Sequence, residues 1–355
     1  MPYIIRDKKY SFASIFDPET GAYARTGIIK DGKDTGVDPF MASFPHLIDV
    51  GVMGHCIHGK TGLCAKAGIG CYQSGLSIEK PNMTVKDFRW IAEQCRHKVN
   101  QFALGGRGDP DQHENFAELL RICHDNDIVP NFTTSGYGMT PQLATLCKAY
   151  CGAVAVSWYR SDYTLAAIRM LLEAGVKTNV HYVLGNNSID EALDRLAGRD
   201  FPKGINAVVF LLHKPVGLGS RENMLDYRDP RVGEFFSYVD AGNLPFKIGV
   251  DSCTVPGIVN HCKRVTPESL DTCEGGRFSC YISSEMEMMP CSFDQTGRYG
   301  VTLRGSTIEE VWNSPEFEAF RRPLRESCPD CEKRSACMGG CPLMPEIVLC
   351  DQKNH

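Results

Sequence analysis

An alternation of apolar segments and amphipathic segments fills the middle of the chain and limits the folds open to it. Between residues 45 and 251, six short apolar segments are each followed by a loop and then by a stretch with apolar residues at helical spacing. Such alternation predicts parallel strands joined by right-handed helical crossovers. Six units predict a partial α/β barrel of the TIM type, because a full barrel of eight units typically takes about 250 residues. The expected strands are residues 46–52, 99–104, 128–133, 152–157, 177–184, 205–212 and 246–250.

The segments on either side of this region differ from it in pattern. Residues 11–29 predict two strands around a turn at 17–21, a short hairpin that covers the bottom or edge of the barrel. After Ser252 the alternation stops, and cysteine, glycine and proline become frequent. We therefore predict three parts: an N-terminal hairpin extension at 1–45, a partial barrel at 46–252 and a small cysteine-rich domain at 253–355.

The charge balance and apolar runs of the chain exclude several classes of protein. The 38 basic and 43 acidic side chains leave a net charge of −5, which does not indicate a nucleic-acid-binding surface. The longest uncharged apolar runs, such as residues 207–212, are far shorter than the ~20 residues of a membrane-spanning helix. The N-terminus lacks the apolar core of an export signal, so we expect a cytoplasmic protein. In such a protein, 17 cysteines indicate metal binding rather than disulfides.

Six cysteines are scattered between residues 95 and 262. Cys95, Cys123 and Cys147 occupy apolar positions of helical patterns, which predicts that they pack in the core as small apolar residues. The other three, Cys151, Cys253 and Cys262, are left without an assigned role.

Eight cysteines crowd into the last 83 residues. Eight thiolates are enough for two tetrahedral metal sites or for two four-iron clusters. Zinc sites favour paired Cys-x2-Cys motifs, and this region has only one, so the spacing favours iron–sulfur clusters while zinc stays open. The order is Cys273-x6-Cys280-x10-Cys291-x36-Cys328-x2-Cys331-x5-Cys337-x3-Cys341-x8-Cys350.

The spacing of the four cysteines between residues 328 and 341 resembles the core of the SPASM domain of the radical S-adenosylmethionine superfamily. Gly275 and Gly276, and Pro290 before Cys291, also fit that pattern. The resemblance spans roughly residues 45–350 and implies a partial barrel of six units followed by a small iron–sulfur domain of the SPASM or twitch type. It implies two auxiliary 4Fe-4S clusters, one held by Cys273, Cys280, Cys291 and Cys341, the other by Cys328, Cys331, Cys337 and Cys350.

A third group of cysteines lies in a glycine-rich stretch after the first expected strand. In the superfamily the corresponding loop holds a catalytic 4Fe-4S cluster through three cysteines, which leaves one iron free for S-adenosylmethionine. The resemblance implies that Cys56, Cys64 and Cys71 are these ligands. The family spacing is Cys-x3-Cys-x2-Cys, whereas here it is x7 and x6, and His55 and His58 stay open as alternative ligands.

The loops after later strands carry the residues that the resemblance assigns to the cosubstrate. A Gly-Gly-Arg-Gly-Asp-Pro sequence after the second strand is similar to the family's Gly-Gly-Glu-type motif. Two polar residues of the fifth strand either reach the adenosine or are satisfied groups of the core. The expected contacts are Gly105, Gly106 and Asp109 for the methionine amino group, Ser157 for the ribose, Arg160 for the carboxylate, and Asn179 and His181 for the adenosine.

The resemblance implies that S-adenosylmethionine is cleaved to a 5'-deoxyadenosyl radical, which abstracts a hydrogen from a peptide or protein side chain. Two auxiliary clusters favour a net oxidation, either a crosslink or a dehydrogenation, with an external one-electron donor of the flavodoxin or ferredoxin type. Sulfatase-maturase relatives have an Asp directly after the residue corresponding to Cys291, where this chain has Ser292. We therefore expect Asp294 to be the nearby base. The alternatives are a radical enzyme with a small-molecule substrate and a zinc-stabilised binding module without catalysis.

Overall fold

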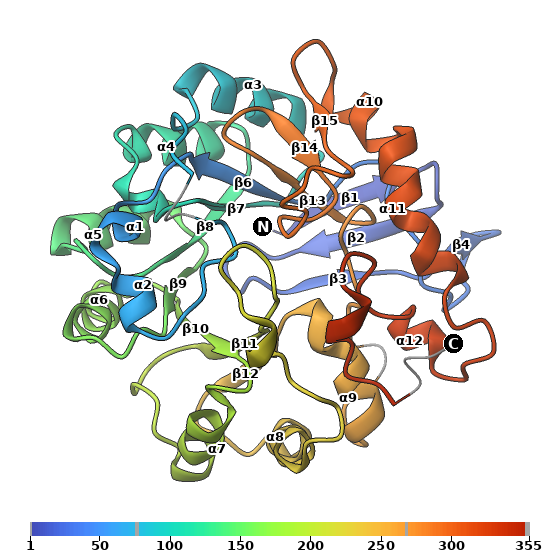
Figure 1. The fold of residues 1–355 in the computed structure, drawn as a ribbon. Coiled ribbons are helices and arrows are strands. Elements are labelled where there is room, and N and C mark those ends of the chain that lie inside the picture. The colour runs from blue at the N-terminus through green and yellow to red at the C-terminus, as the bar shows by residue number, and fades with distance from the viewer. Residues whose placement is uncertain (1, 75–77, 267–268, 352–355) are drawn as a thin grey trace.

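The computed structural model describes residues 2–74, 78–266 and 269–351. Its main sheet has ten strands, and eight of these are consecutive parallel neighbours. Figure 1 shows the sheet with helices around it. All seven expected strands are present, so the predicted partial barrel is confirmed. They are β6 (Leu47–Met53), β7 (Gln101–Gly106), β8 (Val129–Thr134), β9 (Val154–Ser157), β10 (Thr178–Leu184), β11 (Ala207–Leu212) and β12 (Lys247–Val250).

Amphipathic helices connect these strands and cover the outside of the sheet (Figure 1). Thr84 caps the first of them by accepting a hydrogen bond from the backbone N–H of Asp87. Cys95, Cys123 and Cys147 are fully buried among apolar residues, which confirms their predicted packing role. The connecting helices are α3 (Val85–Cys95), α4 (Phe116–Asp125), α5 (Pro141–Tyr150), α6 (Asp162–Glu173), α7 (Ile189–Gly198) and α8 (Pro230–Ala241).

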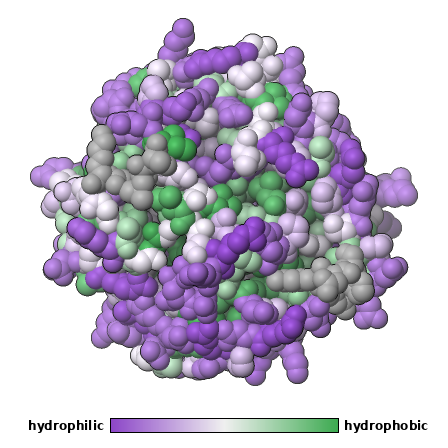
Figure 2. Space-filling model, viewed as in Figure 1, coloured by the Kyte–Doolittle hydropathy of each residue, from purple (hydrophilic) through white to green (hydrophobic). Residues whose placement is uncertain are grey.

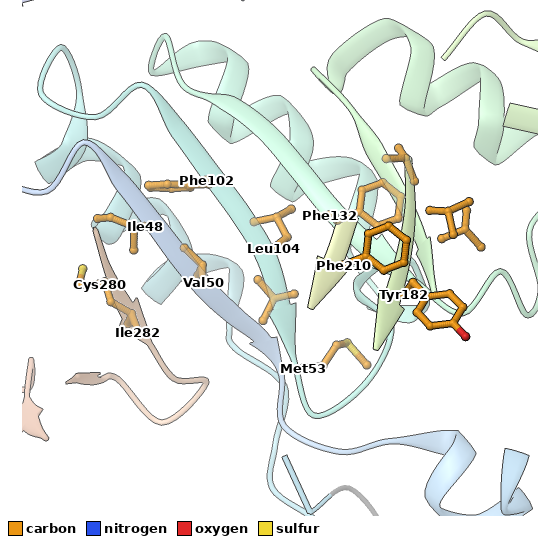
Figure 3. Packing of buried hydrophobic residues seen from close by; sticks show 14 of the residues in the cluster. Ile48, Val50, Met53, Phe102, Leu104, Phe132, Tyr182, Phe210, Cys280 and Ile282 are labelled. Atoms are coloured by element: carbon orange, nitrogen blue, oxygen red, sulfur yellow. The ribbon is translucent and has the colours of Figure 1, made fainter. Parts of the chain in front are cut away.

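The two faces of the sheet are built from alternating residues of each strand. Ile48, Phe102, Leu104, Phe132 and Phe210 are at most 3% exposed and pack in one cluster with apolar residues of the helices (Figure 3). The other face lines the lumen of the barrel, which is open enough to leave its residues only half-buried. Residues on that face include Asp49, Ala103, Thr133, His181 and Val209.

The N-terminal segment forms a small antiparallel sheet of β1 (Tyr3–Asp7), β2 (Phe12–Phe16) and β3 (Tyr23–Arg25). The expected hairpin around residues 17–21 is the β2–β3 pair, and β1 is a strand that the sequence pattern did not reveal. Lys177, next to the start of β10, donates to the carbonyl oxygen of Glu19 at 2.9 Å. The turn therefore covers the barrel at the end where the strands begin. Two-residue strands β4 (Ile29–Lys30) and β5 (Lys33–Asp34) follow it.

The cysteine-rich region continues the barrel sheet. β13 (Ser279–Ile282) pairs in parallel with β6, and β14 (Glu287–Met289) and β15 (Val301–Thr302) extend the sheet beyond it. The fully buried Trp312 belongs to the same hydrophobic cluster as Ile48, and its indole N–H donates to the carbonyl oxygen of Ala42. Sheet and core thus run across the boundary expected near Ser252.

Of the remaining helices of this region, the first packs against α8 and against the last, and the middle two lie on the side of the sheet where β15 is (Figure 1). Helix length also bears on the question of a membrane span. In the described ranges, every helix is too short or too polar to cross a bilayer. These helices are α9 (Val255–His261), α10 (Ile308–Trp312), α11 (Pro315–Glu326) and α12 (Arg334–Cys337).

Candidate functional site

Three cysteines meet in the loop that follows β6. Cys56 precedes helix α1 (Ile57–Thr61), Cys64 lies in α2 (Leu63–Lys66), and Gly62, with a φ of 69°, ends the first helix and starts the second. Burial raises the pKa of the Cys64 thiol to about 11, a hydrogen bond with Tyr159 opposes this, and the nearby thiols of Cys56 and Cys71 raise it further. The long spacings are therefore taken up by helical turns, and the three thiols still come together.

The two histidines of this loop make other contacts. His58 is buried, and its Nε2 lies 2.8 Å from Oδ2 of Asp109 and 2.9 Å from Oγ of Ser135. The Nδ1 of His55 lies 3.3 Å from the carbonyl oxygen of Lys80. Neither of these contacts involves a cysteine, and His58 instead ties the cysteine loop to the loop after β7.

The glycine-rich loop after β7 presses against the backbone that enters the cysteine loop. Gly106 has a φ of 115°, and a Cβ there would lie 2.4 Å from the carbonyl oxygen of Met53. The backbone N–H of Arg107 donates to that same oxygen at 2.9 Å. By contrast, a Cβ on Gly105 would meet no atom within 4 Å. Gly105 therefore borders open space, whereas Gly108, two residues after Gly106, lies against the cysteine loop, where a Cβ would be 2.6 Å from the carbonyl oxygen of His55.

Two buried polar atoms of the loops after β6 and β7 lack partners in the described part of the chain. Nε of Arg107 and Nδ1 of His58 have no hydrogen-bond partner among the described residues. Buried polar groups without partners are rare in proteins, so they are compatible with a polar ligand near these loops. Together with the three thiols, they fit a three-cysteine cluster with a polar cosubstrate.

The two glycines are expected to respond in opposite ways to substitution by alanine. Gly106→Ala should lower the free energy of unfolding by at least about 1 kcal/mol, because its φ and the Met53 contact exclude a side chain. Gly105→Ala should leave stability unchanged but weaken S-adenosylmethionine binding about tenfold, since the new methyl group enters the open space that Gly105 borders. Chemical denaturation and calorimetric titration measure the two effects. Unchanged affinity in Gly105→Ala would place the cosubstrate elsewhere.

Asp109 and Arg160 are not free for the contacts expected of them. Both oxygens of the Asp109 carboxylate accept hydrogen bonds, Oδ1 from the Ser135 N–H at 3.0 Å and Oδ2 from the Ser135 hydroxyl. Arg160 forms an ion pair with Glu191 and donates to the carbonyl oxygen of Ala67 at 3.1 Å. Both residues thus fix loops in place, and the structure gives no support to their direct contact with the methionine moiety.

The polar residues of β9 and β10 lie at different heights in the lumen. Ser157 is the last residue of β9 and pairs in register with His181, in the middle of β10. Asn179 lies near the start of β10, where its Oδ1 accepts from Asn206 at 2.8 Å. Asn179 lines a 320 Å³ cavity behind the N-terminal turn, so the expectation that it reaches the adenosine does not agree with the structure.

His181 lines the same cavity as Asn179, from the middle of the lumen. Its Nδ1 lies 3.2 Å from the hydroxyl of Thr133, and burial lowers its pKa to about 4. Two roles were left open for His181: contact with the adenosine, or a polar residue of the core whose hydrogen bonds are made within the protein. These contacts agree with the second role.

Four of the last cysteines of the chain lie near one another. Burial raises the pKa of the Cys328 thiol, and the neighbouring thiols of Cys331 and Cys350 raise it further. Burial also raises the pKa of Cys337 to about 11, and Cys350, Cys328 and Cys331 again add to the effect. All four line one cavity of about 360 Å³, and Cys341 lines the same cavity.

The other C-terminal group differs from the expected one in a single member. Burial and the neighbouring thiol of Cys253 raise the pKa of Cys273 to about 12, and burial, Cys273 and Cys253 raise that of Cys291. Cys341 hydrogen-bonds to Cys253, which raises the pKa of Cys253. Cys253 therefore stands where Cys280 was expected.

Cys280 has the position of a core residue. It is 2% exposed, pairs in register with Ile48, and packs with Ile48 and Ile282 (Figure 3). Burial raises its pKa well above the ordinary value, and the neighbouring Cys95 adds to this. The expectation that Cys280 joins Cys273 and Cys291 therefore disagrees with the structure.

The spacing of these thiols is wider than that of a single-ion site. Within the described part of the chain, no three histidine, cysteine, aspartate or glutamate side chains lie close enough to share one metal ion. A four-iron cluster distributes its thiolates over separate iron atoms, so its ligands surround a larger volume.

Asp294, the expected base, holds a turn together. It is 4% exposed and accepts hydrogen bonds from the backbone N–H groups of Arg298 and Tyr299 and from the hydroxyl of Thr296. A different carboxylate faces the lumen: burial raises the pKa of Asp49 on β6 to about 7. The structure thus argues against Asp294 as a base and directs attention to Asp49.

Comparison with known families decides the nature of the C-terminal region. Residues 273–332 match SPASM, described as an iron-sulfur cluster-binding domain. Residues 273–332 are therefore similar to a SPASM domain. The SPASM domain follows the partial barrel directly in the chain and shares its sheet.

Solved structures share the fold of the barrel and the SPASM domain together. SuiB from Streptococcus suis bound to the precursor peptide SuiA has a TM-score of 0.69 and 14% identity, over 96% of this chain and 95% of that one. SuiB bound to S-adenosylmethionine has a TM-score of 0.65 and 17% identity, over 88% and 78% of the two chains. The protein anSMEcpe, with bound AdoMet and the Cp18Cys peptide, has a TM-score of 0.60 and 13% identity, over 87% and 91%.

Proposed function

We propose that this protein is a radical S-adenosylmethionine enzyme that oxidatively modifies a side chain of a peptide or protein, by a crosslink or a dehydrogenation. The observation that carries the proposal is that Cys56, Cys64 and Cys71 lie in one loop at the carboxyl end of the first barrel strand, close enough for Cys56 and Cys71 to act on the thiol of Cys64. A SPASM domain on the same sheet supports it. Solved structures of this fold contain S-adenosylmethionine and peptides, which supports both as ligands here.

Each cysteine group has a defined task in this proposal. Three thiolates hold a four-iron cluster with one open iron, and when bound there, S-adenosylmethionine supplies the 5'-deoxyadenosyl radical for hydrogen abstraction. The two C-terminal groups hold auxiliary clusters that accept an electron from the substrate. The proposed ligands are Cys56, Cys64 and Cys71 for the first cluster, Cys253, Cys273, Cys291 and Cys341 for the second, and Cys328, Cys331, Cys337 and Cys350 for the third.

The lumen supplies the substrate side of the site. In Figure 2, hydrophobic residues gather near the middle of the viewed face and hydrophilic residues surround them, as a site that admits a peptide side chain and limits water would require. Tyr72, directly after Cys71, packs against Phe293 with ring centroids 4.5 Å apart. Asp49, with its raised pKa, is the lumen carboxylate suited to accept the proton that the oxidised substrate releases. An external flavodoxin or ferredoxin is the proposed electron donor.

The mass of the product tests the oxidative part of the proposal. A peptide substrate is expected to lose two hydrogens, a decrease of about 2 mass units, because the auxiliary clusters let a second electron leave the substrate. Mass spectrometry of the anaerobic reaction in heavy water measures it. A product of unchanged mass apart from one solvent deuterium at carbon would show epimerisation, and turnover of a sugar or nucleoside alone would indicate a small-molecule enzyme.

A further inference from the structure

A lysine is buried in its charged form where the barrel meets the SPASM domain. Lys214 follows β11, and its side chain is 2% exposed. Its ammonium lies 2.6 Å from Oδ2 of Asp251, donates to the carbonyl oxygen of Leu212 at 2.9 Å, and lies 4.4 Å from the ring centroid of Phe293. Burial of a charge is costly, so an ion pair held this deeply calls for a reason beyond stability.

The partners of this lysine place it between two members of one cysteine group. Asp251 lies two residues before Cys253, and Phe293 lies two residues after Cys291. The ion pair with Asp251 at 2.6 Å favours the charged ammonium. The contacts of Lys214 with Asp251 and Phe293 hold that charge against the two segments that carry Cys253 and Cys291.

Asp251 is fixed as firmly as the lysine. Its Oδ1 accepts from the hydroxyl of Thr254 at 2.6 Å, and its Oδ2 also accepts from the backbone N–H of Leu212 at 3.2 Å. Both charges of the pair thus have a set position relative to Cys253, because Asp251, Thr254 and Cys253 belong to one short segment. Charges at fixed positions in a low-dielectric interior act strongly on a neighbouring redox group.

A four-iron cluster with four thiolates is anionic, and it gains a further negative charge when it accepts an electron. A nearby positive charge stabilises the reduced form more than the oxidised form. We propose that Lys214 acts through the cluster held by Cys253, Cys273, Cys291 and Cys341, and that its ammonium raises the reduction potential of that cluster so that it can accept the substrate's electron. This inference rests on the proposed function. Lys214 is therefore a positioning residue and not a catalytic one, because it acts on the electron-accepting cluster and not on the substrate.

Redox titration of the purified holoenzyme, followed by electron paramagnetic resonance, tests this inference. Lys214→Gln is expected to shift the midpoint potential of one cluster to a more negative value, and Asp251→Asn to shift the same cluster to a more positive value. Lys214→Arg keeps the charge and should restore a potential close to that of the unchanged protein. The cluster held by Cys328, Cys331, Cys337 and Cys350 serves as an internal control and should not move.

The outcomes separate this inference from the function on which it rests. An unchanged protein that binds no iron–sulfur cluster contradicts the proposed function. A fully loaded Lys214→Gln protein with unchanged potentials overturns the role of Lys214 and leaves the function standing. If Lys214→Gln fails to fold or to retain iron, Lys214→Met decides: a shift of the same cluster to a more negative potential supports the inference, and an unchanged or more positive potential overturns it.

Discussion

Replacement of Cys56 by alanine is expected to reduce the cleavage of S-adenosylmethionine to the background rate. With Cys64 and Cys71 alone, the loop after β6 cannot hold a four-iron cluster, and S-adenosylmethionine then has no open iron to bind. The yield of 5'-deoxyadenosine from the reduced, anaerobically purified protein measures this, by chromatography. The expected loss is complete, because hydrogen abstraction depends on this cleavage.

A cysteine outside the three groups provides the control for this experiment. Cys151 ends helix α5, is half-buried, and has Cys147 as its neighbour. Cys151→Ala is expected to cleave S-adenosylmethionine at the native rate. Native rates of 5'-deoxyadenosine formation in Cys56→Ala would show that the unusual spacing of this loop has been assigned the wrong ligands.

The second prediction with a large effect compares Cys253 with Cys280. Cys253→Ala is expected to lower the iron content by about four atoms per chain, from about twelve to about eight, because its thiol meets those of Cys273, Cys291 and Cys341. Cys280→Ala should keep all the iron and lose about 1 kcal/mol of stability, since its thiol only fills space in the core. Iron analysis and thermal unfolding measure the two effects.

Iron loss in Cys280→Ala together with full loading in Cys253→Ala would restore the ligand set that the resemblance to the SPASM domain implied. Stoichiometric zinc in place of iron would contradict the cluster assignment as a whole and favour a zinc-stabilised binding module.

The features predicted correctly from the sequence were those that depend on local spacing. The parallel strands follow from apolar periodicity, and the approach of Cys328, Cys331 and Cys337 follows from their closeness in the chain. Local spacing could not reveal Cys253, because this residue is far in the chain from Cys291 and Cys341. It comes near them only because the segment after β12 lies there in the folded protein. One sign in the sequence indicated that Cys253 has a role: this cysteine belonged neither to an apolar core position nor to a cysteine motif.

Side-chain direction explains the other differences. Alternation along β10 indicates that Asn179 faces the lumen, but it does not indicate at which end of the lumen the residue acts. On β13, alternation points Cys280 to the helix-covered face, and this could be seen only once the register with Ile48 was known. Asp294 has the same sequence context whether it caps a turn or serves as a base, and only its three donors decide between these roles.

The pairing of β13 with β6 has a consequence for how the protein is made. Residues 279–282 are synthesised long after residues 47–50, so β6 keeps one unpaired edge while the intervening barrel units emerge and fold. An unpaired strand edge is a template for wrong pairing with other chains. The loop with Cys56 follows β6 directly. If iron is bound there before the last quarter of the chain has been made, it is bound while the sheet still lacks β13. Expression of the barrel without its SPASM domain is therefore expected to give aggregated protein.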